Sequence, residues 1–160
     1  MPNIGDVDQD YKLWVLLGQA SDMIFEAREN ELREYGITAM QAEVLFAVQA
    51  IGDKTTPAQI SRWTLRRPHS ISGILDRMEK VGLIRKTKDL ARKNQVRVSM
   101  TDKGRQAYNK SLKRKSIHRI MSALAEEERQ QLWSRLETAR NKALKEVGKD
   151  PKKVPFPKSL

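Results

Sequence analysis

The chain has 160 residues, of which 39% are hydrophobic and 32% charged, and its 31 Lys and Arg against 20 Asp and Glu give a formal net charge of +11. This length favours one domain, and the modest apolar content favours a core shared with a second subunit. The absence of cysteine excludes disulfides and thiolate chemistry, and only two histidines are present for a metal or acid–base centre. We therefore expect a cytoplasmic protein with no cofactor and no metal, which is not an enzyme and does not insert into a membrane.

The charge is distributed unevenly along the chain. Residues 1–53 hold 3 basic and 10 acidic side chains, residues 54–110 hold 15 and 4, and residues 111–160 hold 13 and 6. A middle segment this basic is typical of a surface that binds nucleic acid, although a solvated basic face would give the same count. The order of the predicted elements decides between these two interpretations.

The first third of the chain is predicted to be helical. Between residues 10 and 35 apolar side chains recur at helical spacing and extend beyond one face, so this helix is expected to pack against more than its own core. Gly36 is expected to end it. The pattern T-x-x-Q at Thr38 then predicts a capping box that opens a second helix through Ile51.

Two shorter helices are predicted next. A second T-x-x-Q at Thr56 is followed by Pro57 at the first helical position, and Pro68 opens another helix after a turn at residues 66–67. Gly82 is expected to end this last helix. Its apolar positions follow the i, i+3, i+4, i+7 pattern of one buried face and are Ile71, Ile74, Leu75 and Met78.

The hydrophobic period changes after Gly82. Residues 83–88 and 96–100 are predicted to be strands, joined by a polar hairpin loop over residues 89–94. A short helix, a turn, a second helix and a two-stranded hairpin form a winged helix-turn-helix. An α-helix of this kind fits the major groove of DNA, and its N-terminal residues reach base edges.

The rest of the chain is predicted to return to helix. Thr101 is predicted to be the N-cap of a fifth helix that runs to about Ala123, and the acidic residues 126–128 begin a sixth helix that Gly148 closes. The tail, residues 149–160, has three prolines and is predicted to be extended or disordered, with folding onto a partner subunit as the alternative. The predicted fold class is mainly α with a small β-hairpin (α+β), with six helices.

This order of elements predicts two regions with different functions. Residues 1–36 and 102–148 form a helical dimerisation region, and residues 37–101 form the winged helix-turn-helix DNA-binding region. The side chains expected at the dimer interface are Leu13, Leu17, Leu132, Leu136 and Val147. The side chains expected to contact DNA lie on the polar side of the helix from Pro68, at its start and in the hairpin, and are Arg66, Arg67, His69, Ser70, Ser72, Gly73, Arg77, Arg92, Lys93 and Asn94.

Three segments, ITAMQAEVL, SISGILDRMEKVGLI and VRVSMTDKG, resemble the multiple-antibiotic-resistance regulator (MarR) family of bacterial transcription factors. The resemblance covers residues 11–147. It implies a homodimer that binds a palindromic operator in double-stranded DNA, acts as a repressor and is released by a small aromatic effector. The wing differs from the family's usual Asp-Arg-Arg, since Arg92, Lys93 and Asn94 stand at those positions, and we expect phosphate contacts from Arg92 and Lys93.

Two alternatives remain open from the sequence. A winged helix can also serve as a protein-interaction module that binds nucleic acid only non-specifically; dispensable arginines at positions 66, 67 and 92 would favour it. The three tryptophans, Trp14, Trp63 and Trp133, can border a pocket for an aromatic ligand or can belong to the core, where large aromatics at helical spacing usually lie.

Overall fold

The computed structural model describes residues 7–88, 91–92 and 94–160 of the chain. These residues form α-helices, two short 3₁₀-helices (η2, η3) and one antiparallel hairpin. In chain order the elements are α1 (Gln9–Leu32), η2 (Arg33–Tyr35), α2 (Ala39–Ile51), α3 (Pro57–Thr64), α4 (Pro68–Lys80), β1 (Ile84–Lys88), β2 (Val96–Met100), α5 (Asp102–Ser111), α6 (Lys115–Met121), α7 (Glu126–Glu146) and η3 (Pro151–Lys153).

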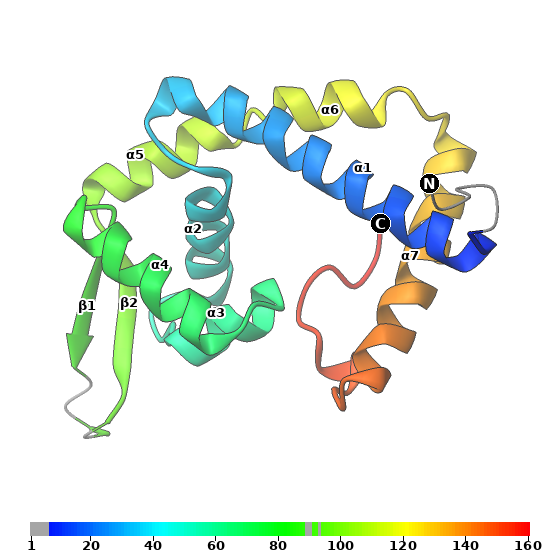
Figure 1. Ribbon diagram of the computed structural model, residues 1–160. Coiled ribbons are helices and arrows are strands. Elements are labelled where there is room, and N and C mark those ends of the chain that lie inside the picture. Colours follow the sequence, from blue (N-terminus) through cyan, green and yellow to red (C-terminus); the bar gives the residue numbers. More distant parts are fainter. Residues whose placement is uncertain (1–6, 89–90, 93) are drawn as a thin grey trace, which may run out of the picture.

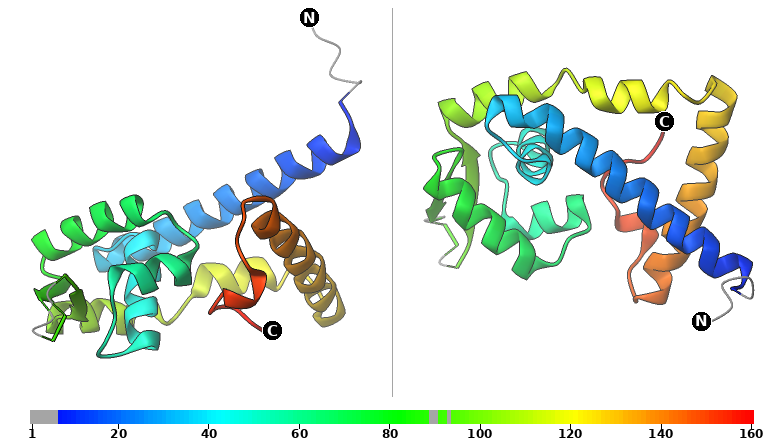
Figure 2. Two further views of the ribbon diagram at one scale, coloured as in Figure 1. Left: turned by 90° about the horizontal axis from the view of Figure 1, so that it is seen from below. Right: turned by 45° about the horizontal axis from the view of Figure 1, so that its top comes forward.

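The elements fall into a winged helix-turn-helix lobe and a set of long flanking helices, as predicted (Figure 1). The lobe contains α2, α3, α4 and the hairpin. Helices α1, α5 and α6 run along one side of the lobe, and α7 lies at the far end (Figure 1). The N-terminal end of α1 extends beyond the lobe in both views of Figure 2.

The hydrophobic core lies within the winged lobe. The apolar face of α4 is buried at the positions predicted for it, residues 71, 74, 75 and 78, and packs with side chains of α2, α3 and the hairpin. Along the 24 residues of α1, by contrast, only Leu32 is buried. The two parts therefore differ in kind: the lobe has its own core, and the flanking helices leave apolar side chains exposed.

The predicted helix starts are confirmed. Thr38 and Thr56 each cap a helix through a complete capping box with the Gln three residues later, and the Thr101 hydroxyl accepts a hydrogen bond from the backbone N–H of Gly104. A capping hydroxyl or carboxamide satisfies N–H groups that have no partner inside the helix. These local bonds explain why the boundaries at residues 38, 56 and 101 could be read from the sequence.

The predicted fifth helix is interrupted, which corrects the expectation of one helix from residue 102 to about Ala123. The chain forms α5 and α6 instead, with Arg114 in a left-handed conformation at φ 47° between them. Arg28 of α1 donates to the carbonyl of Ser111 at 2.7 Å, where α5 ends. Glu31, one turn further along α1, accepts hydrogen bonds from the backbone N–H groups that open α6.

The Glu31 carboxylate is the cap of α6. It accepts from the N–H of Lys115 at 2.6 Å, from the N–H of Ser116 at 3.1 Å and from the Ser116 hydroxyl at 2.5 Å. Burial by itself would raise the pKa of Glu31, but the hydrogen bonds from Ser116, Lys115 and Arg28 outweigh it and lower this pKa from 4.5 to about 2. A cation at the end of one helix and an anion at the start of the next stabilise the break.

The tail departs from the predicted extended or disordered chain at residues 151–153, whereas residues 154–160 form no helix or strand. Residues 151–153 form η3, Val154 is only 5% exposed, and Arg140 of α7 donates to the carbonyl of Pro157 at 3.3 Å. The tail turns back toward the winged lobe and lies between α7 and α3 (Figure 1). The composition predicts that solvent surrounds this segment. Val154 and Phe156 make apolar contacts with the protein instead.

No helix within the described ranges has the length and the apolar character that crossing a membrane requires.

Candidate nucleic-acid interface

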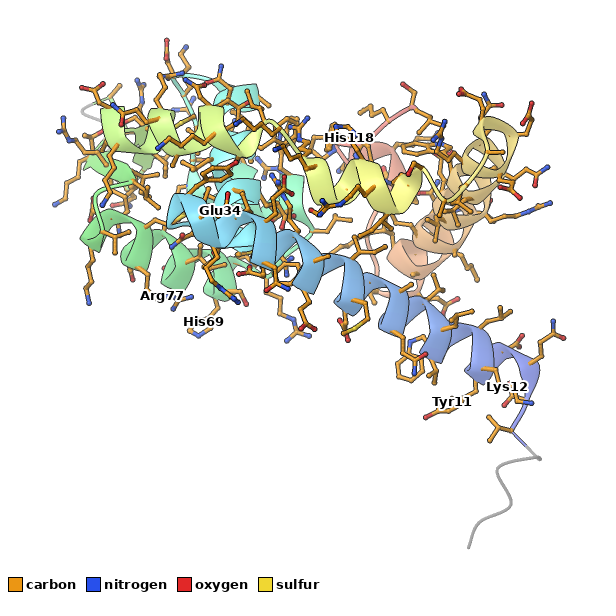
Figure 3. The ribbon with its side chains drawn as sticks, turned by 90° about the horizontal axis from the view of Figure 1, so that it is seen from above. Tyr11, Lys12, Glu34, His69, Arg77 and His118 are labelled. Carbon is orange, nitrogen blue, oxygen red and sulfur yellow. The ribbon has the colours of Figure 1, made fainter. Side chains whose placement is uncertain are left out.

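The polar side of α4 is exposed to solvent. Arg67, His69, Ser70, Ser72 and Arg77 are all exposed, opposite the buried apolar face of the same helix. His69 and Arg77 project from α4 on the same side, away from α5 (Figure 3). The sequence predicted this arrangement because the apolar residues occupy the other face at helical spacing.

Gly73 lies among these polar residues, and because it has no side chain nothing projects from α4 at this position. A Cβ atom added to Gly73 would meet only the terminal Nη1 atom of Arg77, at 3.5 Å, so the Arg77 side chain lies back over the glycine. Ser70 and Ser72 are the other small residues on this side. A helix surface made of small residues lets the backbone approach the floor of a groove.

Arg66 is held against α2. Its Nη2 atom lies 3.2 Å from an Oε2 atom of Glu43, its carbonyl accepts a 2.5 Å hydrogen bond from the Ser61 hydroxyl, and Leu65 before it is left-handed at φ 54°. The side chain is 37% exposed. Arg66 therefore fixes the α3–α4 turn through an ion pair that the sequence did not predict, in addition to standing beside the polar side of α4.

The wing is a regular two-stranded hairpin. Its register pairs Ile84 with Met100 and Lys88 with Val96. Arg92 and Asn94 are exposed, whereas Lys93 lies outside the described residues. The N–H of Val98 donates to the carbonyl of Thr55 at 2.8 Å, so the second strand is also tied to the turn before α3.

Lys86 links the wing to α4, a contact that was not predicted from the sequence. Its ammonium group pairs with Asp76 and lies 3.8 Å from Glu79, and its backbone N–H donates to Glu79 at 2.8 Å. The hydrogen bond and charge of Lys86 lower the pKa of the Asp76 carboxyl. Both acids stand on α4 at the helical spacing of three residues. A lysine on the next strand, opposite in charge to these two acids, was the sequence signal that could have indicated the contact.

The residues expected at a dimer interface are exposed in the single chain. Leu13, Leu17, Leu132, Leu136 and Val147 are between 39% and 69% exposed. Tyr11 and Trp14 at the same end of α1 are exposed as well, and Figure 3 places Tyr11 on the part of α1 that extends away from the lobe. Large apolar side chains left exposed in this way are typical of an interaction surface.

Sequence and structure comparisons identify relatives of this chain. Residues 35–92 match the MarR family. The crystal structure of the organohalide-sensing transcriptional regulator RdhR-CbdbA1625 in its 2,4-dichlorophenol-bound form is 31% identical, with a TM-score of 0.83 over 90% of this chain and 87% of that chain. The chain belongs to the MarR family. It is a transcription regulator that binds DNA, and not an enzyme.

Other solved structures agree in fold. The ligand-free form of RdhR-CbdbA1625 is 29% identical, with a TM-score of 0.90 over 100% of this chain and 96% of that chain. The MepR–DNA complex of S. aureus is 21% identical, with a TM-score of 0.73 over 81% of this chain and 96% of that chain. A comparison with curated protein sequences gives no match.

Proposed function

We propose that this MarR-family protein is a homodimeric, sequence-specific repressor that occupies a promoter and is released by a small aromatic effector. The observation that carries the proposal is α4, which has a buried apolar face, an exposed polar side and a basic wing beside it. Steric occupation of a promoter by such a protein prevents transcription. A regulator of this kind acts in the cytoplasm, where its DNA lies.

The residues divide by what they would contact. Ser70, Ser72 and Gly73, with His69 and Arg77, stand where base edges of the major groove would lie. Arg67, at the start of α4, would neutralise a phosphate, and Arg66 would hold the turn in place at the edge of the duplex. In the wing Arg92, Lys93 and Asn94 would contact the backbone of the DNA, which positions a protein without reading sequence.

A second copy of the chain would cover the exposed apolar surface of α1 and α7. Residues 1–36 and 102–148 form the dimerisation region in this proposal, and residues 37–101 form the DNA-binding region. Two-fold symmetry would place two α4 helices one DNA turn apart, about 34 Å, and would require a palindromic operator. An isolated protomer would be poorly stable in water because its apolar surface would stay exposed.

The effector site would be a cavity of about 500 Å³ between the flanking helices and the winged lobe. This volume suits a drug-sized molecule. The relative RdhR-CbdbA1625 was crystallised with 2,4-dichlorophenol, which supports an aromatic compound here. An effector that binds better to a dimer whose α4 helices no longer match successive grooves would shift the population to that form and release the DNA.

Substitutions on α4 and on the wing test the division of contacts. A Tyr at Ser72 would fill the space beside the base edges, so S72Y is expected to lower the preference for the selected duplex over a scrambled one about tenfold. Arg92→Ala removes a phosphate contact and is expected to weaken both duplexes by the same factor. The measurement is fluorescence anisotropy on a duplex selected by the protein from a random pool, at one salt concentration.

Opposite results would change the assignment. If R92A altered base preference, or S72Y left it intact, α4 and the wing would not have these roles. If the wild-type protein bound both duplexes equally and R92A had no effect, the winged helix would be a protein-interaction module.

A further inference from the structure

The tail connects the end of α7 with the winged lobe. At its start, the N–H of Lys149 donates to the carbonyl of Leu144 at 2.8 Å, which keeps the tail on the end of α7. Val154 is buried and, with Leu65 and Pro68, lines the hollow between the tail and the α3–α4 turn. Residues 149–157 thus form a strap, the name used below, that runs from α7 to the DNA-binding lobe.

Phe156 of the strap packs in an aromatic cluster. Its ring stacks on Trp63 of α3, with centroids 5.3 Å apart and an angle of 15° between the planes. It also meets Phe46 of α2 edge-on, with centroids 5.0 Å apart. Aromatic pairs at these distances add attraction beyond the area they bury. The sequence allowed two interpretations of Trp63, a side chain that lines a ligand pocket or one that belongs to the core. In the structure the strap covers it.

The same ring borders the effector cavity. The apolar part of the cavity wall is formed by α1, α2, α5, α6 and the strap, and includes Ile24, Phe25, Phe46, Tyr108, Ile117 and Phe156. Phe156 is the contribution of the strap to this wall. Four of the side chains that line the cavity are aromatic, which favours an aromatic ligand over an aliphatic one of equal size.

The charges in the cavity wall indicate where an anionic group would bind. Arg28 is paired with Glu31 at 3.0 Å, and Glu43 is paired with Arg66. Arg114 has no acidic partner within the described part of the chain, and its guanidinium carbon lies 5.7 Å from the centroid of the Phe46 ring. A carboxylate or phenolate beside Phe46 would find its counter-ion in Arg114.

We propose that the strap is a specificity-determining part of the effector site, in which Phe156 recognises the ring of an aromatic acid and Arg114 binds its anionic group. This inference rests on the proposed effector site. Because Phe156 also stacks on Trp63, a ligand that moves this ring moves the contact between the strap and α3. The strap thereby connects occupancy of the cavity to the helix-turn-helix.

Calorimetric titration without DNA tests the ligand contacts. The probes are benzoate and cyclohexanecarboxylate, which share a charge and differ in the ring. The wild-type protein is expected to prefer benzoate, and Phe156→Leu, which keeps apolar bulk, is expected to reduce that preference about fivefold. Leu160→Ala, in the same tail but 74% exposed, is the control and is expected to match the wild type.

A second pair of probes isolates the charge. Arg114→Gln is expected to weaken benzoate about tenfold and to leave the neutral benzamide unchanged. Absence of benzoate binding to the wild type, or an unchanged ring preference in F156L with an unchanged melting temperature, overturns the inference. Since no DNA is present, neither result depends on whether the protein represses transcription.

A DNA measurement then tests the connection through the strap. Release is measured relative to the affinity of each protein for the selected duplex without ligand, and F156L is expected to resist release at benzoate concentrations that release the wild type. If F156L were released as readily at equal occupancy of the cavity, the strap would not connect the two sites. If the wild type did not bind duplex DNA at all, the proposed function would fail and the calorimetric result would stand.

Discussion

Gly104→Ala is expected to destabilise the protein by about 3 kcal/mol or more, because there is no room for a side chain at this position. Gly104 is buried in the first turn of α5, and a Cβ atom there would lie 2.0 Å from the carbonyl oxygen of Leu83 and 3.0 Å from its carbonyl carbon. The same oxygen accepts a hydrogen bond from the N–H of Thr101. The start of α5 and the turn before the wing would have to separate.

Gly73→Ala is the matched control. Gly73 lies inside α4, where the nearest atom to an added Cβ is the end of a flexible arginine, and Ala is a better helix former than Gly by up to about 1 kcal/mol. Thermal unfolding at one protein concentration should place G104A about 10 °C below the wild type and G73A at or above it. Equal melting temperatures for G104A and the wild type would show that α5 does not pack so closely on the wing.

Glu31→Ala is expected to lower the free energy of unfolding by about 3 kcal/mol. The substitution removes the acceptor for two N–H groups and one hydroxyl at the start of α6 and leaves Arg28 without its ion-pair partner. The Glu31 side chain is only 9% exposed, so water would replace these bonds poorly. Glu34→Ala, at an exposed position in η2, should change stability by less than about 0.5 kcal/mol.

The effect of Glu31 should depend on pH in a defined direction. Its pKa in the folded protein is lowered from 4.5 to about 2, so its stabilising contribution is fully present above pH 4.5 and is lost as the pH falls through 2. The difference in stability between the wild type and E31A should be constant from pH 7 to pH 5 and should shrink below pH 4.5. A difference that stayed constant down to pH 2 would contradict the capping role.

The features that were predictable from the sequence depend on nearby residues. The caps at Thr38, Thr56 and Thr101 bond to groups three residues away, and the buried face of α4 follows from helical spacing. The strands of the wing form where they were predicted, and β2 has the expected bounds. Each of these signals lies within one element, so a single sequence contains it.

The features that were missed depend on contacts between distant residues. Glu31 and Ser116 are 85 positions apart, yet their hydrogen bond turns one predicted helix into α5 and α6. The pairing of Glu43 with Arg66 spans 23 positions and gives that arginine a structural partner. Phe156 follows a proline in a segment whose composition favours disorder, and its aromatic partners on α2 and α3 determine its place. Hydrophobic period and capping patterns carry no information on such pairs.

The most direct test of the account is the salt dependence of duplex binding, because the central claim is that the cationic winged lobe binds DNA through its phosphates. With about six phosphate contacts, the affinity should fall on the order of 10³-fold between 50 and 200 mM salt. The measurement is anisotropy of a labelled duplex, with the dimer verified by sedimentation at each salt concentration. A steep linear fall of log K with log salt is the predicted result, and an affinity that stays constant over this range would contradict the claim.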